Sequence, residues 1–80
     1  MGLHELAPGE RGIVTALLTS GSMRRRFLDI GLVRDTPVEC VGRSPGGDPS
    51  AYRIRGAVIA IRAADACSVR VCREEETLWK

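Results

Sequence analysis

Five short stretches of this chain have the length and the alternation of β-strands. They are rich in β-branched and aliphatic residues, and in the third of them Tyr52 and Ile54 alternate with arginines. Runs of Gly, Pro, Ser and Asp separate the stretches, most densely over residues 44–49, which must form a loop. We therefore predict strands over residues 12–18, 38–43, 51–55, 58–62 and 68–72.

The pattern changes to a helical period over residues 23–30. Met23, Phe27 and Ile30 are spaced so that they lie on one face of a helix, while arginines fill its first turns. Gly31 follows at the position where a left-handed C-terminal cap is common. The sequence therefore predicts one short helix that begins at residue 23 and ends at residue 30.

The predicted elements fit one small antiparallel barrel. Only Gly56-Ala57 separates the third strand from the fourth, which indicates a hairpin, and a helical turn over residues 63–66 leads into the last strand. Short strands joined mostly by tight turns favour an all-β fold, here a barrel of about five strands with one or two short helices. We expect a single domain, residues 1–80, whose acidic end, residues 74–80, is a flexible tail.

The charge of the chain is mild. The net charge is +2, from 12 Lys and Arg residues against 10 Asp and Glu residues, which does not require a polyanionic partner. The three aromatic residues, Phe27, Tyr52 and Trp79, are too few to form a platform for stacked bases. We expect no nucleic-acid partner, although two groups of arginines could line a phosphate track: residues 24–26, and Arg53, Arg55 and Arg62 of the hairpin.

No arrangement of residues in the sequence supports catalysis. The single histidine, His4, lies near the start of the chain beside Glu5 without a nucleophile pattern, so we interpret it as an exposed terminal side chain. The aspartates are scattered through predicted turns and helix ends. We therefore predict that the protein is not an enzyme, that it has no catalytic or cofactor-binding residues, and that it needs no cofactor.

The cysteines Cys40, Cys67 and Cys72 form neither a disulfide framework nor a zinc-knuckle spacing. If residues 68–72 form a strand with its valines inward, Cys72 points outward, away from an inward Cys40. We interpret Cys40 and Cys67 as small buried apolar residues and predict no metal site, with metal binding at any of the three thiols left open. Reduced thiols, together with the lack of a signal peptide or membrane span, predict a cytoplasmic location.

The predicted helix is the best candidate for a protein-binding surface. Phe27 and Leu28 are adjacent and point about 100° apart on a helix, while a single short helix on a small barrel buries one stripe. Two interpretations stay open: both side chains are buried in a wide face, or one is exposed as an apolar anchor beside arginines, which interfaces favour. The candidate partner contacts are Arg24, Arg25, Phe27 and Leu28.

The order of the motifs resembles the FeoA family of small accessory proteins of ferrous iron transport. The chain reads LAPGERGIV at the first turn and strand, RRRFLDIGL at the helix, and SPGGDPSAYRIRGAVIAIRAADACSVRV from the loop to the last strand. The resemblance covers residues 3–73, the expected core of the domain. The chain departs from the family mainly after the helix, where Arg34-Asp35 stand in place of the usual Pro-Gly.

The resemblance implies an SH3-like barrel, no enzymatic activity and no iron-ligand set. It implies that the protein binds the FeoB membrane transporter through its cytoplasmic G-protein region and supports ferrous iron uptake, so that it reaches the membrane only through this partner. Whether the effect is activation, assembly or regulation stays open. The oligomeric state also stays open, because the edge of the hairpin could pair weakly with a second copy.

A second resemblance provides an alternative function. The C-terminal domain of DtxR-like iron-dependent repressors is similar to this chain in sequence style. The resemblance implies a free-standing regulatory domain that contacts a transcription factor or nucleic acid.

Overall fold

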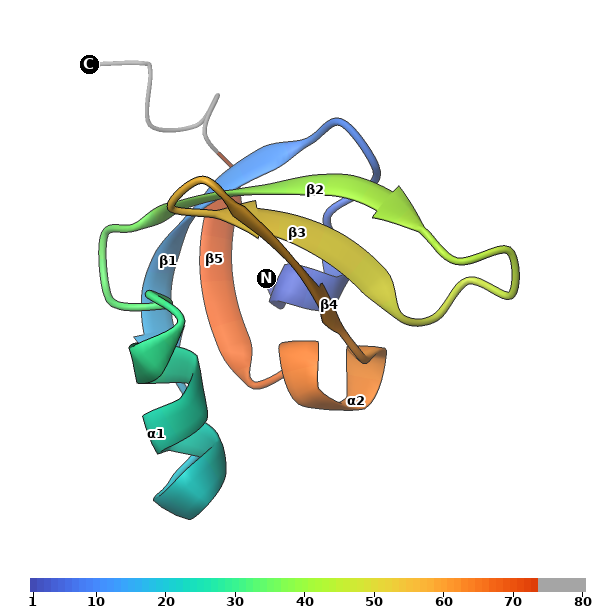
Figure 1. Ribbon diagram of the computed structural model, residues 1–80. Coiled ribbons are helices and arrows are strands. Elements are labelled where there is room, and N and C mark those ends of the chain that lie inside the picture. The colour runs from blue at the N-terminus through green and yellow to red at the C-terminus, as the bar shows by residue number, and fades with distance from the viewer. Residues whose placement is uncertain (74–80) are drawn as a thin grey trace, which may run out of the picture.

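The computed structural model describes residues 1–73, in which five strands form one antiparallel sheet of order β4-β3-β2-β1-β5 (Figure 1). The predicted flexible tail, residues 74–80, lies outside the described residues. The mainly β fold and the number of strands are confirmed. The elements are η1 (Leu3–Glu5), β1 (Arg11–Leu17), α1 (Gly21–Asp29), β2 (Pro37–Arg43), β3 (Ser50–Ile54), β4 (Ala57–Ile61), α2 (Ala63–Ala66) and β5 (Val69–Arg73).

The hairpin turn between β3 and β4 lies one residue earlier than predicted. The register pairs Ile54 with Ala57, so the turn consists of Arg55 and Gly56 rather than Gly56 and Ala57. Both turn residues have positive φ, 51° at Arg55 and 84° at Gly56, as the tightest hairpin turns require. The predicted turn is wrong because Arg55, although it continues the alternating pattern of the strand, adopts the left-handed conformation.

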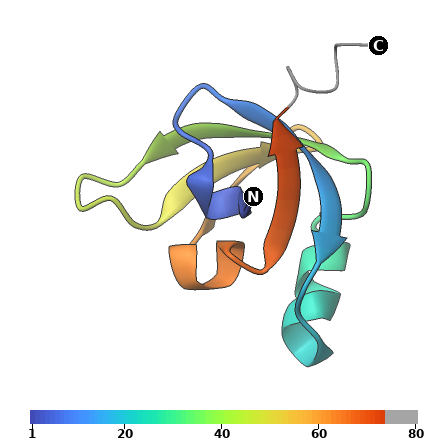
Figure 2. The same cartoon turned by 180° about the vertical axis from the view of Figure 1, so that it is seen from behind.

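The sheet curves around the core because two of its strands contain bulges. The register shifts between Val14 and Ala16 on β1 and between Cys40 and Gly42 on β2, and an extra residue of this kind bends a strand. The sheet curves round on itself, as the two views of the ribbon show (Figures 1 and 2). The buried apolar core consists of Leu3, Leu6, Val14, Phe27, Leu32, Val38, Cys40, Tyr52, Ile54, Ile61, Ala66, Val69 and Val71.

The end of α1 is closed by the left-handed glycine cap that the sequence predicts. The N–H of Leu32 donates to the carbonyl of Phe27 at 2.9 Å, and the N–H of Gly31 donates to the carbonyl of Leu28 at 3.1 Å. Gly31 has a φ of 99°, and the side chain of Arg55 packs over it, since a Cβ there would lie 2.6 Å from the Arg55 Cδ. The hairpin turn therefore contacts the C-terminal end of the helix.

The N-terminal segment covers one of the two sheet edges. The N–H of Val71 on β5 donates to the carbonyl of Met1 at 2.8 Å, and Gly2 forms a bridge with Arg70 (Figure 2). The carboxylate of Glu5 holds this segment by accepting a hydrogen bond from the N–H of Gly2 at 2.9 Å. The other edge strand, β4, pairs only with β3 among the described strands.

We expect Gly31→Ala to lower the free energy of unfolding by about 1–2 kcal/mol. The alanine backbone would have to keep the left-handed φ of Gly31, and its Cβ would displace the side chain of Arg55. Gly46→Ala is the matched control, because Gly46 has no positive φ and an added Cβ there would meet no atom within 4 Å. Urea unfolding of both variants measures the difference. Equal stability of the two variants would contradict this account of the cap.

We expect the stability of the domain to fall in acid as two carboxylates protonate. The pKa values of Glu5 and Glu10 are lowered from 4.5, chiefly because each carboxylate accepts a hydrogen bond from a backbone N–H, that of Gly2 and that of Ala7. A carboxylate whose pKa is lower in the folded state than in the unfolded state stabilises the fold at pH values above the unfolded-state pKa. This contribution disappears as the pH falls through the folded-state pKa. Urea unfolding across this range should show a shallower acid dependence in the Glu5→Gln, Glu10→Gln double variant, and an unchanged dependence would contradict the assignment.

Candidate functional site

Helix α1 projects beside the barrel and presents two different faces (Figure 1). Its inner face carries Met23, Phe27 and Ile30, which pack on the core as their spacing predicts. Its outer face carries Arg24, Arg25 and Leu28, which line a shallow depression together with Gly21, Ser22 and Asp29. The structure therefore brings three of the four predicted partner contacts together on the outer face of one helix.

The fourth predicted contact, Phe27, lies in the core. Its side chain is 3% exposed, whereas that of Leu28 is 40% exposed, so Leu28 is the available apolar side chain of this pair. Phe27 is therefore not an exposed apolar anchor on the outer face, because the helix turns that residue onto the barrel. Residues one position apart point about 100° from each other, and a helix of nine residues on a small barrel buries a narrow stripe.

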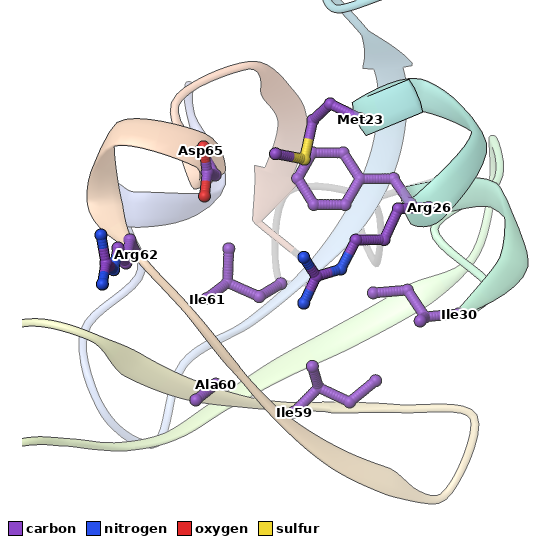
Figure 3. A pocket seen from close by; sticks show the side chains of 9 residues that line it. Met23, Arg26, Ile30, Ile59, Ala60, Ile61, Arg62 and Asp65 are labelled. Carbon is purple, nitrogen blue, oxygen red and sulfur yellow. The ribbon is translucent and has the colours of Figure 1, made fainter. Parts of the chain in front are cut away.

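A cleft of about 420 Å³ separates the inner face of α1 from β4 and α2 (Figure 3). Its apolar walls come from both sides, and the guanidinium of Arg26 extends from α1 into the cleft (Figure 3). Arg62 and Asp65 lie at the α2 end. The lining residues are Met23, Arg26, Phe27, Ile30, Ile59, Ala60, Ile61, Arg62 and Asp65.

Sequence reasoning did not single out the cleft. Arg26 stands three residues after Met23 and four before Ile30, so its position on the cleft-facing side of α1 could have been read from the helical period. The opposite wall could not, because Ile59 and Arg62 reach the cleft only through the curvature of the sheet and the start of α2. Local sequence patterns contain no information about which distant residues come to face α1 across the cleft.

The hairpin arginines do not form one phosphate track. Arg53 pairs with Glu39 on the neighbouring strand, with its Nη1 3.1 Å from the Glu39 Oε1. Arg55 packs over Gly31 at the end of the helix, and Arg62 lines the cleft beside α2. The three side chains therefore serve different parts of the structure.

One of the cysteines and the single histidine are placed differently from the predictions. Cys40 is buried, as predicted, but Cys67 is exposed at the C-terminal end of α2, because the helical turn carries it outward and its thiol lies 3.1 Å from the carbonyl of Ala64. Cys72 is half-buried on β5. His4 is half-buried in η1 rather than exposed, since the N-terminal segment lies against the barrel.

Within residues 1–73, no three or more His, Cys, Asp or Glu side chains gather in a way that could hold a metal ion. Burial raises the pKa of Tyr52, so its hydroxyl stays protonated at neutral pH. None of the helices in this part of the chain is long and apolar enough to cross a membrane. The outer face of α1 and the adjoining cleft bring apolar side chains and arginines together, and we take them as the candidate site for recognition.

Solved structures show the same fold. FeoA from Chlorobium tepidum matches with a TM-score of 0.86 and 32% identity over 92% of this chain and 70% of that chain. FeoA from Stenotrophomonas maltophilia, complexed with zinc and described as a procaryotic SH3 domain protein, matches with a TM-score of 0.81 and 26% identity over 90% of this chain and 89% of that chain. The predicted SH3-like fold is thus confirmed.

A manganese-dependent transcriptional repressor also matches, with a TM-score of 0.80 over 91% of this chain and 36% of that chain. Its identity is 21%, so this likeness shows the fold alone.

The sequence comparisons identify the family. The Fe(2+) transport protein A/Fe(2+) transporter FeoB fusion protein of Porphyromonas gingivalis is 31% identical over 71 residues. These residues make up 89% of this chain and 8% of the length of the fusion protein. The family model of the FeoA domain matches residues 1–73, and the chain therefore belongs to the FeoA domain family.

Proposed function

We propose that this domain is a non-enzymatic accessory protein of ferrous iron transport. It binds the cytoplasmic G-protein region of a FeoB-like transporter and supports or regulates iron uptake. The observation that carries the proposal is the fusion protein of Porphyromonas gingivalis, whose name places an Fe(2+) transport protein A and an Fe(2+) transporter FeoB in one chain. A covalent link raises the effective concentration of two parts that act together.

The chemistry of the described residues supports binding rather than catalysis. The half-buried His4 is not among the residues that line the cleft, and the lining contains one carboxylate, that of Asp65. General acid–base catalysis requires positioned groups within reach of a reacting atom. A cleft walled by isoleucines and flanked by arginines is better suited to hold a protein segment.

We assign the contact with the transporter to the exposed side of α1. Leu28 supplies an apolar anchor that is 40% exposed, and Arg24 and Arg25 stand beside it. Exposed arginines around an apolar anchor are a common composition of protein interfaces. Arg24 is also positioned by the end of β1, since its Nη1 donates to the carbonyl of Leu17 at 3.3 Å.

The structure does not favour the alternative of a nucleic-acid contact. In residues 1–73 the aromatic side chains are those of Phe27 and Tyr52, and both are buried. Stacking of bases on exposed aromatics is the usual means of binding single strands. The likeness to a transcriptional repressor concerns the fold, and it supports no further statement about function.

Phe27 and Leu28 separate the folding role of α1 from its binding role. We expect Phe27→Ala to lower the free energy of unfolding by about 3–5 kcal/mol, because it leaves a cavity in the core. Leu28→Ala should change it by less than about 1 kcal/mol, because that side chain is partly in solvent. Thermal and urea unfolding of the two variants test this, and a large loss for Leu28→Ala would contradict the assignment of the outer face.

We expect the domain to bind the purified cytoplasmic region of a FeoB-like transporter. The double variant Arg25→Ala, Leu28→Ala should bind it about tenfold more weakly. Arg53→Ala is the control, because Arg53 lies on the sheet and makes an exposed ion pair. Calorimetry on the folded variants measures the affinities. No binding by the wild-type domain would refute the proposed function, and equal binding by all variants would refute the assignment to α1.

A further inference from the structure

Among the described residues, strand β4 (Ala57–Ile61) pairs on one side only, and its open edge lacks the charges, prolines and bulges that commonly protect an edge strand. Its sequence is AVIAI, without a charge or a proline, and its pairing with β3 shows no bulge. Val58 on this strand is 55% exposed. The edge at β5 differs, because the N-terminal segment pairs with it and its strand contains two arginines. An apolar open edge of this kind is a template for another strand.

The open edge offers backbone groups in a regular order. Antiparallel partners alternate between hydrogen-bonded and non-hydrogen-bonded pairs, and a two-residue turn closes on a hydrogen-bonded pair, here Ile54 and Ala57. Counting from that pair, Val58 and Ala60 direct their N–H and C=O groups away from β3. An added strand would satisfy these groups.

The cleft reaches the open edge of β4. Ile59 and Ile61 point into it from the inner face of the strand, and Ala60, which stands between them, also belongs to its lining (Figure 3). Paired strands lie about 4.8 Å apart, so a strand added to β4 would occupy the cleft. Helix α1 forms the opposite wall, which leaves room for one extended segment but obstructs the sheet of a second copy.

The charges along the cleft indicate which side chains a segment bound there would carry. Arg26 extends into the cleft and Arg62 lies at its α2 end, and neither makes an ion pair with another residue in the described range 1–73. Asp65 is the single acidic residue of the lining. The apolar walls favour apolar side chains, and the two arginines favour carboxylates between them.

We propose that an extended segment of a partner protein, apolar and bearing carboxylates, binds the cleft by adding to the open edge of β4 as a further strand. The inference deepens the proposed function, on which the identification of the partner as the transporter rests. Backbone pairing with β4 holds the segment, and Arg26 and Arg62 select its acidic side chains.

The first test uses a defined probe, the blocked peptide Ac-Glu-Val-Glu-Val-Glu-Val-amide, titrated into the isotopically labelled domain. We expect chemical-shift changes centred on Val58 and Ala60, slower hydrogen exchange of their amides, and weaker binding of the matching Lys-Val peptide. The same peptide with alternate backbone nitrogens methylated should bind at least about tenfold more weakly. Absence of binding at millimolar peptide, equal binding of the methylated peptide, or changes confined to another surface would overturn the proposal.

The second test changes the strand. Ala60→Pro removes an outward N–H without removing a hydrogen bond to β3, so it should abolish binding of the Glu-Val peptide, whereas Ala60→Thr retains the N–H and should bind like the wild type. Two-dimensional spectra establish that both variants are folded. If Ala60→Pro does not fold, the methylated peptide decides the question with the wild-type domain. Sedimentation of the wild type as a dimer and of Ala60→Pro as a monomer would overturn the choice of a partner segment over a second copy.

The transporter's cytoplasmic region then separates this inference from the proposed function. Binding of that region to the wild type and its loss in Ala60→Pro would support both. Equal binding to the wild type and to Ala60→Pro would overturn the role of β4 and leave the proposed function intact. No binding to the wild type would refute the proposed function, while the peptide titration still decides whether β4 accepts an acidic strand.

Discussion

The two edges of an open antiparallel sheet are the constraint on which the rest of this structure depends. Five curved strands enclose a core, but the outermost strands, β4 and β5, do not pair with each other. The chain covers the β5 edge with its own first residues, through the hydrogen bonds between Met1 and Val71. Within residues 1–73 it leaves the β4 edge open beside α1, and the cleft follows from that difference.

Helix α1 connects the packing of the core to the candidate binding surface. Phe27 anchors the helix on the barrel, and the glycine cap at Gly31 ends it where the turn residue Arg55 packs against it. The two walls of the cleft, α1 and β4, are therefore joined at one end by a direct contact. Because the walls are held in this way, the cleft is a preformed feature, and a bound segment would need to order mainly itself.

The candidate binding site on α1 was predictable from the sequence only in part, as the positions of individual residues show. The helical period identified the arginines of α1, but adjacent Phe27 and Leu28 are both apolar, and only packing on the barrel assigns one to the core and the other to the surface. The exposed position of Cys67 depends on the orientation of a four-residue helix. The carboxylate of Asp48 accepts the N–H of Ala63 at the start of that helix, a contact between segments that no local pattern encodes.

The sequence by itself predicted the strands, the helix with its glycine cap and the mainly β fold, and the order of its motifs indicated the family. The elements follow from side-chain period, from breaker residues and from the ease with which glycine ends a helix, all of which are local properties of the chain. Only the tertiary structure decided that Arg26 and Arg62 flank one cleft and that β4 has an open edge. Those features arise from the curvature of the sheet, which depends on bulges and on contacts between residues far apart in the chain.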